Sequence, residues 1–98
     1  MVDYELNELR REFLDEARGK VTEMETALDG ARDEQTLERL SYLAHQLKGS
    51  GGSYGYQRIS DDAAELEKAI EDGRIDGDLS TYVTSLKNEI DRAASELA

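Results

Sequence analysis

Apolar residues at helical spacing, in a chain that contains no proline, are the feature that most restricts how this sequence can fold. Between residues 6 and 28 the apolar side chains recur at steps of three or four, which places them on one face of a long helix. The same spacing returns in three later segments, and stretches that contain glycine separate them. Because proline would break such helices, its absence favours helices over a turn-rich β fold. The sequence therefore predicts an all-α fold.

Short polar residues and glycines mark the ends of the first two helices. Asp3 is expected to cap the first helix and Gly30 to end it, because short polar side chains accept hydrogen bonds from free amides and glycine suits a helix end. Asp33 and Glu34 indicate the start of a second helix, which Gly55 ends. The predicted inward faces are Leu6, Leu9, Phe13, Ala17, Val21, Met24 and Leu28, and then Leu37, Leu40, Ala44, Leu47, Gly51 and Tyr54.

The last two helices follow the same pattern. Gly73 is expected to end the third helix, and Asp78 can cap the fourth. Their predicted inward faces are Ile59, Ala63, Leu66 and Ile70, and then Leu79, Val83, Leu86, Ile90, Ala93 and Leu97. Since the connections are short, consecutive helices should be antiparallel neighbours. Residues 1–98 are therefore expected to form one domain, an up-down-up-down antiparallel four-helix bundle.

The charge and composition limit the partners that such a bundle can have. The formal net charge of -11 would repel nucleic acid and anionic lipid, so we expect no nucleic-acid partner and no membrane partner. No apolar stretch is long enough to cross a bilayer, and the charged first twenty residues are unlike a signal peptide. The absence of cysteine fits an intracellular setting. We expect a cytoplasmic monomer that binds other proteins.

The single histidine, His45, is expected to lie on the outer face of the second helix. At about 100° of rotation per residue, it points roughly 130° away from the centre of that helix's apolar face. Ser41 lies one turn away on the same side, and Tyr42 lies nearby and faces outward. Gly49 and Gly52 flank the histidine and leave it unobstructed, although each glycine costs the helix about 0.5 to 1 kcal/mol relative to alanine. These two glycines suggest a docking surface.

A surface histidine is usually only a solvated side chain, and GSGGS is usually a flexible loop. Lys48 argues for chemistry instead, because a lysine three residues after His45 can bring a positive charge to an anion attached to the imidazole. The glycine-rich segment matches neither GxGxxG nor GxxxxGK[ST], so we predict no nucleotide site. One histidine without cysteine also makes a transition-metal site improbable.

The string His45-Gln46-Leu47-Lys48-Gly49-Ser50, with Gly55 five residues beyond, resembles the signature of histidine phosphotransfer domains, which include the phosphoacceptor domain at the start of chemotaxis kinases. The resemblance covers the second and third helices well and the other two only by pattern. It implies that His45 is phosphorylated, that Lys48 steadies the phosphoryl group and that Gly49 leaves space for a receiver domain. It also implies that the receiver supplies the aspartate and Mg²⁺, so no cofactor is expected here.

The resulting prediction is a phosphorelay protein of two-component signalling. His45 would accept a phosphoryl group from the phosphoaspartate of a response-regulator receiver domain and donate it to another, because neutral imidazole is nucleophilic near pH 7. Such a chain is a phosphocarrier and not an enzyme by itself, and its partners are receiver domains, a histidine kinase or both. Two alternatives remain open: the phosphoacceptor domain of a chemotaxis-like kinase, and a non-catalytic helical adaptor with an incidental histidine.

Overall fold

Four helices make up nearly all of the structure, a computed structural model that describes residues 2–73 and 78–97. The helices are α1 (Val2–Asp29), α2 (Glu34–Ser53), α3 (Gln57–Glu71) and α4 (Asp78–Leu97). The described residues contain no β-strand. The predicted all-α fold is confirmed.

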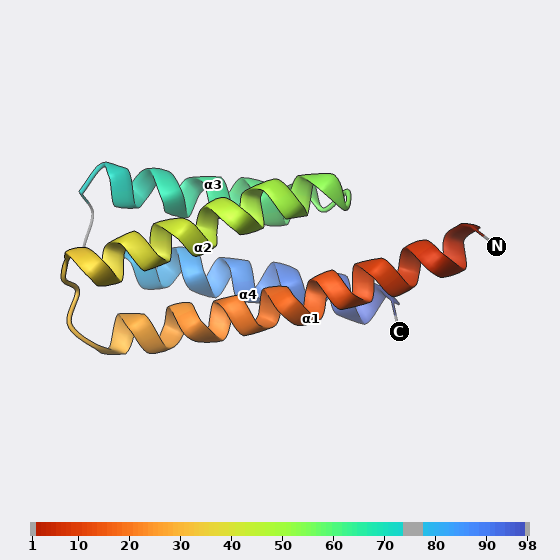
Figure 1. The fold of residues 1–98 in the computed structure, drawn as a ribbon, viewed down its shortest axis with the longest axis horizontal. Helices are drawn as coiled ribbons and strands as arrows, with labels where there is room; N and C mark the ends of the chain where they lie inside the picture. The colour runs from red at the N-terminus through yellow and green to blue at the C-terminus, as the bar shows by residue number, and fades with distance from the viewer. Residues whose placement is uncertain (1, 74–77, 98) are drawn as a thin grey trace.

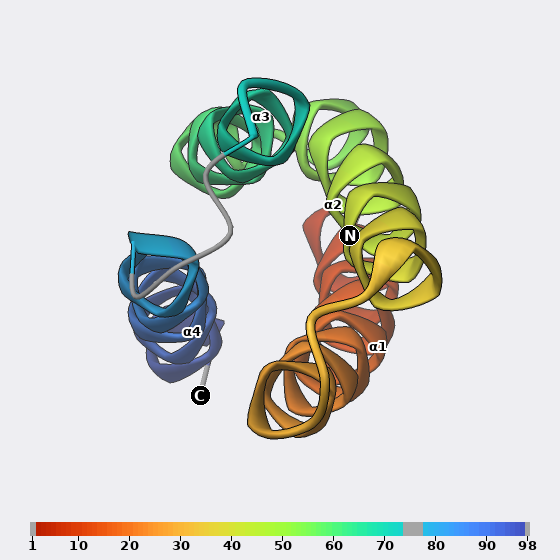
Figure 2. The ribbon, with the colours of Figure 1, turned by 90° about the vertical axis from the view of Figure 1, so that its left-hand side faces the viewer.

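The helices form a ring in which each one packs against two others. α1 lies against α2, α2 against α3, α3 against α4, and α4 closes the ring against α1 (Figure 2). Consecutive helices run in alternating directions, as expected for an up-down-up-down bundle (Figure 1). At 28 residues α1 is the longest helix, and its N-terminal end extends past the other three.

The core fills the centre of this ring with apolar side chains from all four helices. No polar side chain is buried among the described residues. Eighteen hydrophobic residues are buried: Phe13, Leu14, Ala17, Val21, Met24, Leu40, Leu43, Ala44, Leu47, Ile59, Ala63, Leu66, Ala69, Leu79, Val83, Leu86, Ile90 and Ala93. The predicted stripes lacked Leu14, Leu43 and Ala69, because a helix that contacts two neighbours buries a wider face than a single stripe.

Two members of the predicted first stripe, Leu6 and Leu9, are not in the core. Leu6 is partly buried but does not pack against the core, and Leu9 is 47% exposed. Arg11 reaches the carbonyl of Leu97, almost the last residue of α4, and Arg10 reaches that of Tyr54, just past the end of α2. Since both neighbouring helices end at this level, nothing remains to cover Leu9.

The predicted ends of α2 and α3 agree with the structure. The Asp33 side chain accepts a hydrogen bond of 2.9 Å from the backbone N–H of Thr36, so Asp33 is the N-cap of α2. This bond lowers the pKa of the Asp33 carboxyl below its ordinary value. Gly55 and Gly73 have φ angles of 85° and 83°, the left-handed conformation in which glycine ends a helix.

The predicted ends of the first and last helices, α1 and α4, had different outcomes. α1 ends at Asp29, immediately before Gly30, as predicted. The prediction that Asp3 caps α1 is wrong, because the helix already begins at Val2 and Asp3 lies in its first turn. The predicted cap at Asp78 depends on its side chain and on residues 74–77, which lie outside the part of the chain that the structure describes.

Close packing at Gly51 sets the position of α3 against α2. A Cβ atom on Gly51 would lie 3.1 Å from the backbone nitrogen of Ser60 on α3, so a larger residue would force the helices apart. Ser60 Oγ also donates a hydrogen bond of 2.8 Å to the carbonyl of Lys48. These contacts fix which residues of the two helices lie level with one another.

Side chains from α1 hold the far end of α2. The Phe13 ring stacks on Tyr54 and Tyr56, with centroid distances of 5.0 and 5.9 Å. Arg10 Nε donates a hydrogen bond of 3.2 Å to the carbonyl of Tyr54 and its guanidinium lies 5.8 Å from the centre of the Tyr56 ring. Burial raises the pKa of the Tyr56 hydroxyl. The glycine-rich segment of α2 is thereby anchored at its end.

Candidate functional site

His45 stands on the outer face of α2, where the helical phase predicts it. Its side chain is 70% exposed. α2 continues through the glycine-rich segment to Ser53, so the residues that follow His45 are helical and do not form the flexible loop that their composition suggests. A rigid helix therefore presents the imidazole to solvent.

A carboxylate from α3 orients the imidazole. Glu67 Oε2 lies 3.1 Å from His45 Nδ1, and the Glu67 side chain is only 17% exposed. An ionised carboxylate can only accept a hydrogen bond, so this contact favours the neutral tautomer in which Nδ1 carries the proton and Nε2 the lone pair. The contact thus leaves Nε2 on the side of the ring that faces away from Glu67.

Glu67 was not predicted from the sequence. Its position follows from the packing of α2 on α3: His45 lies six residues before Gly51, and Glu67 lies seven residues after Ser60, which Gly51 contacts. Because the helices are antiparallel, His45 and Glu67 are brought level. The short connection between the two helices is the signal that could have found this residue.

Lys48 shares the same carboxylate. Its Nζ lies 3.7 Å from Glu67 Oε1, and its side chain is 49% exposed. Glu67 therefore bridges His45 and Lys48, one with each oxygen. The sequence placed Lys48 correctly on the solvent side of α2, but in the structure Lys48 forms an ion pair with Glu67 rather than with a group at the other nitrogen of the histidine.

The predicted docking residues near His45 differ in how exposed they are. Gly49 is exposed, and a Cβ atom built on it would meet nothing within 4 Å. Gly52 is also exposed, but a Cβ there would lie 3.7 Å from Ser60 Oγ, an ordinary contact with α3. Ser41 is partly buried. Gly49 is thus the most open of these positions.

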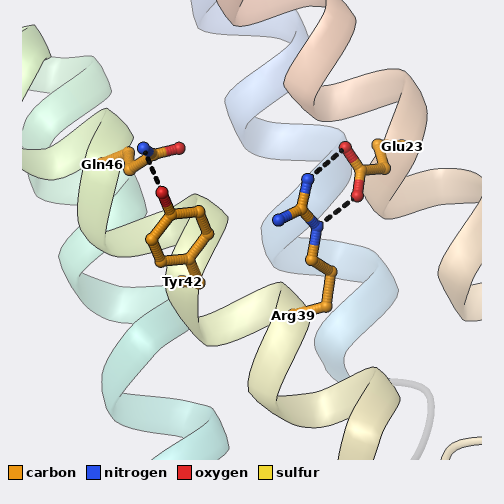
Figure 3. A network of polar contacts seen from close by, with 4 residues as sticks. All are labelled: Glu23, Arg39, Tyr42 and Gln46. Atoms are coloured by element: carbon orange, nitrogen blue, oxygen red, sulfur yellow. Dashed lines mark hydrogen bonds and ion pairs between the residues drawn. The ribbon is translucent and has the colours of Figure 1, made fainter.

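Tyr42 is exposed and held in place by its neighbours (Figure 3). Its exposed fraction is 52%, and its hydroxyl accepts a hydrogen bond of 2.9 Å from Gln46 Nε2. The Arg39 guanidinium lies 5.4 Å from the centre of the ring. Arg39 is fixed in turn by two hydrogen bonds to the Glu23 carboxylate on α1, which lower the pKa of Glu23. The result is an ordered aromatic surface one turn from His45.

A hollow of about 590 Å³ lies between α1 and α2 beside the histidine. Its lining consists of Glu16 and Lys20 from α1, of His45, Gln46, Gly49, Ser50 and Ser53 from α2, and of Tyr54 just past the end of α2. Consequently, His45 lines a shallow, open groove between the two helices.

Other kinds of site find no support in the described residues. No group of three or more potential metal ligands occurs among them. None of the helices, over the residues that the structure describes, is long and apolar enough to cross a membrane.

The structure thus presents an exposed histidine on a four-helix bundle, with a carboxylate 3.1 Å from one ring nitrogen and no cluster of metal ligands among the described residues. The model of the Hpt domain matches residues 8–96, so this chain belongs to the Hpt domain family and functions in phosphorelay signalling. Members of the family are phosphocarriers that interact with receiver domains and kinases. Comparison with curated proteins and with solved structures gave no match.

Proposed function

We propose that His45 is the phosphoacceptor of this Hpt domain. In the transfer, Nε2 attacks the phosphorus of an aspartyl phosphate on a receiver domain. The N–P bond forms as the P–O bond breaks, and the aspartate carboxylate leaves. The reverse reaction, on a second receiver, returns His45 to its neutral form. The observation that carries this proposal is the 3.1 Å contact of Nδ1 with Glu67 on a ring that is 70% exposed.

Glu67 suits the charge that develops during this reaction. Once Nε2 bonds to phosphorus while Nδ1 keeps its proton, the imidazole ring becomes positive. A carboxylate already placed at Nδ1 stabilises that charge without reorganising, as preorganised groups do in other active sites. Glu67 therefore acts as a positioning residue that also favours the phosphorylated state.

Lys48 is proposed to bind the phosphoryl group after phosphorylation. The separation of 3.7 Å from Glu67 is longer than a hydrogen bond, and the lysine side chain is about half exposed. Exposed pairs of this kind contribute only about 0 to 1 kcal/mol, so a phosphoryl group with a charge of about -2 can draw the ammonium away from Glu67.

The receiver is proposed to dock over Ser41, Tyr42, Gly49 and Gly52. The open space at Gly49 allows the backbone of a partner to approach the histidine closely. Tyr42 offers an ordered aromatic side chain, of the type that is enriched among energetically important contacts at interfaces. This surface is on the same face as His45.

The chain itself is proposed to supply only the nucleophile, the lysine and the docking surface. It acts as a phosphocarrier and not as an enzyme on its own, needs no cofactor and relies on Mg²⁺ bound by the receiver. It functions in the cytoplasm as a monomer, with receiver domains, a kinase or both as partners. Among the described residues, only Leu9 and Tyr42 are exposed large hydrophobics, which supports the monomer.

The test is the substitution His45→Gln. This change keeps a polar side chain at an exposed position, so the free energy of unfolding should change by only about 0.5 kcal/mol. Incubation of the purified chain with phosphoramidate and with phosphorylated receivers should produce an acid-labile phosphohistidine only in the unmutated protein. Full labelling of the variant would show that another residue is the acceptor.

A further inference from the structure

The direction of the His45 ring places its reactive nitrogen away from Glu67. Glu67 on α3 holds Nδ1, and Lys48 binds the other oxygen of the same carboxylate. Since the two nitrogens of imidazole point to different sides of the ring, a phosphoryl group on Nε2 projects away from Glu67. On the side of His45 away from Glu67, a groove lies between α2 and α1, and His45 forms part of its lining.

A second lysine stands on the α1 wall of that groove. Lys20 lines the same hollow as His45 and is partly exposed. The contact of Glu23 with Arg39 fixes the register of the two antiparallel helices. His45 lies six residues after Arg39 and is therefore level with about residue 17 of α1. Lys20 is within one turn of that level, a distance of about 4.5 Å along the helix axis.

The charge of Lys20 is available to an incoming anion. The nearby Glu23 has both carboxylate oxygens bound by Arg39, which lowers the pKa of Glu23 more strongly than Lys20 does. Glu16 shares the groove wall one turn away, but no hydrogen bond or ion pair joins it to Lys20 within the described part of the chain. Lys48, by contrast, already has a carboxylate partner.

From this arrangement we propose that Lys20 is a second cation for the reaction at His45, and that its ammonium group contacts the phosphoryl oxygens during transfer and in the phosphorylated protein. The inference rests on the proposed function of His45. It adds a residue from α1 to a site whose other groups come from α2 and α3, so that the phosphoryl group would lie between Lys20 on one side and Lys48 on the other.

The experiment compares Lys20→Met with a matched control, Lys87→Met, which removes an exposed lysine from the groove between α1 and α4. Methionine preserves the helix propensity and the length of the side chain. With phosphoramidate as the phosphodonor, labelling of His45 should slow about fivefold in Lys20→Met, the order expected for one exposed ionic contact. It should stay unchanged in Lys87→Met and recover in Lys20→Arg.

A second readout reports on position rather than rate. The pKa for the last ionisation of the phosphoryl group, followed by ³¹P NMR on the phosphorylated chain, should rise in Lys20→Met because the dianion loses a neighbouring cation. It should not change in Lys87→Met. Thermal unfolding of each variant checks that the bundle is intact.

The outcomes separate this inference from the proposed function. If the unmutated chain becomes labelled on His45 while Lys20→Met matches it in both rate and ³¹P titration, the role of Lys20 is refuted and that of His45 stands. Equal slowing in Lys20→Met and Lys87→Met refutes it too, because the effect would then follow net charge. If the unmutated chain is not labelled on His45 at all, both proposals fail.

Discussion

The substitution Glu67→Gln tests how the carboxylate contributes to the reactivity of His45. Glutamine has nearly the same shape, so its carbonyl can still accept a hydrogen bond from Nδ1, and only the negative charge is lost. A hydrogen bond to a charged group contributes about 1.5 to 3 kcal/mol, and a neutral one about 0.5 to 1.5 kcal/mol. The difference of about 1 kcal/mol applies in full only to a buried pair.

Exposure reduces this value. Glu67 is largely buried, with a side chain that is 17% exposed, but the His45 ring is 70% exposed and water screens the charge that develops on it. We therefore expect about half of this difference in free energy, a decrease of about 2- to 3-fold in the rate of phosphorylation. The loss of the Glu67 charge also releases Lys48 to bind the phosphoryl group, which would raise the rate and offset part of the decrease. In a Lys48→Met background this offset is absent, so Glu67→Gln should there lower the rate by a larger factor.

The assay is the initial rate of phosphohistidine formation with phosphoramidate, with Glu65→Gln as the control. Glu65 is an exposed acid on the same helix, so its replacement changes the net charge equally. Nitrogen NMR of the imidazole gives an independent measure, because it distinguishes a proton on Nδ1 from one on Nε2. If Glu67→Gln and Glu65→Gln label at the same rate, and the Glu67 variant keeps the parent tautomer, then the carboxylate neither orients nor activates His45.

Two further predictions concern docking and stability. Gly49→Gln should raise the free energy of unfolding by some tenths to about 1 kcal/mol, because the position is helical and open, yet transfer from a receiver should fail while labelling by phosphoramidate persists. A variant that is no more stable, or that exchanges phosphate normally with the receiver, would contradict this. For Asp33, whose pKa in the folded chain lies below its ordinary value of 3.8, the carboxylate stabilises the fold above that value and this contribution disappears as the pH falls through the folded pKa. Denaturant unfolding from pH 7 to acid should thus show a smaller loss for Asp33→Asn than for the parent, and parallel curves would refute the cap as its source.

The helices and the exposure of the histidine could be predicted from the sequence because both depend on local periodicity. The phase of the second helix alone places His45 opposite Leu40 and Leu47, and the structure has these two leucines buried and His45 exposed. Caps such as Asp33 are equally local, since the donor lies only three residues away. Asp3 failed because a polar residue near a chain end does not exclude an earlier start of the helix.

The surroundings of His45 could not be predicted in the same way, because they depend on how separate helices align. Whether Glu67 or its exposed neighbour Glu65 faces the histidine depends on the axial register that the packing at Gly51 sets. Periodicity within one helix contains no information about that register. The partner of Lys48 was missed for the same reason.

The location of His45 on a single face also has a consequence for the order of events in signalling. One nucleophile on one surface cannot serve a donor and an acceptor at the same moment, since both would need the space above Gly49. The proposed relay would therefore follow a double-displacement scheme, in which the first receiver departs before the second arrives. Between these encounters the phosphoryl group would stay on His45 with neither partner bound, so the chemical lifetime of the N–P bond would limit how long that interval can last.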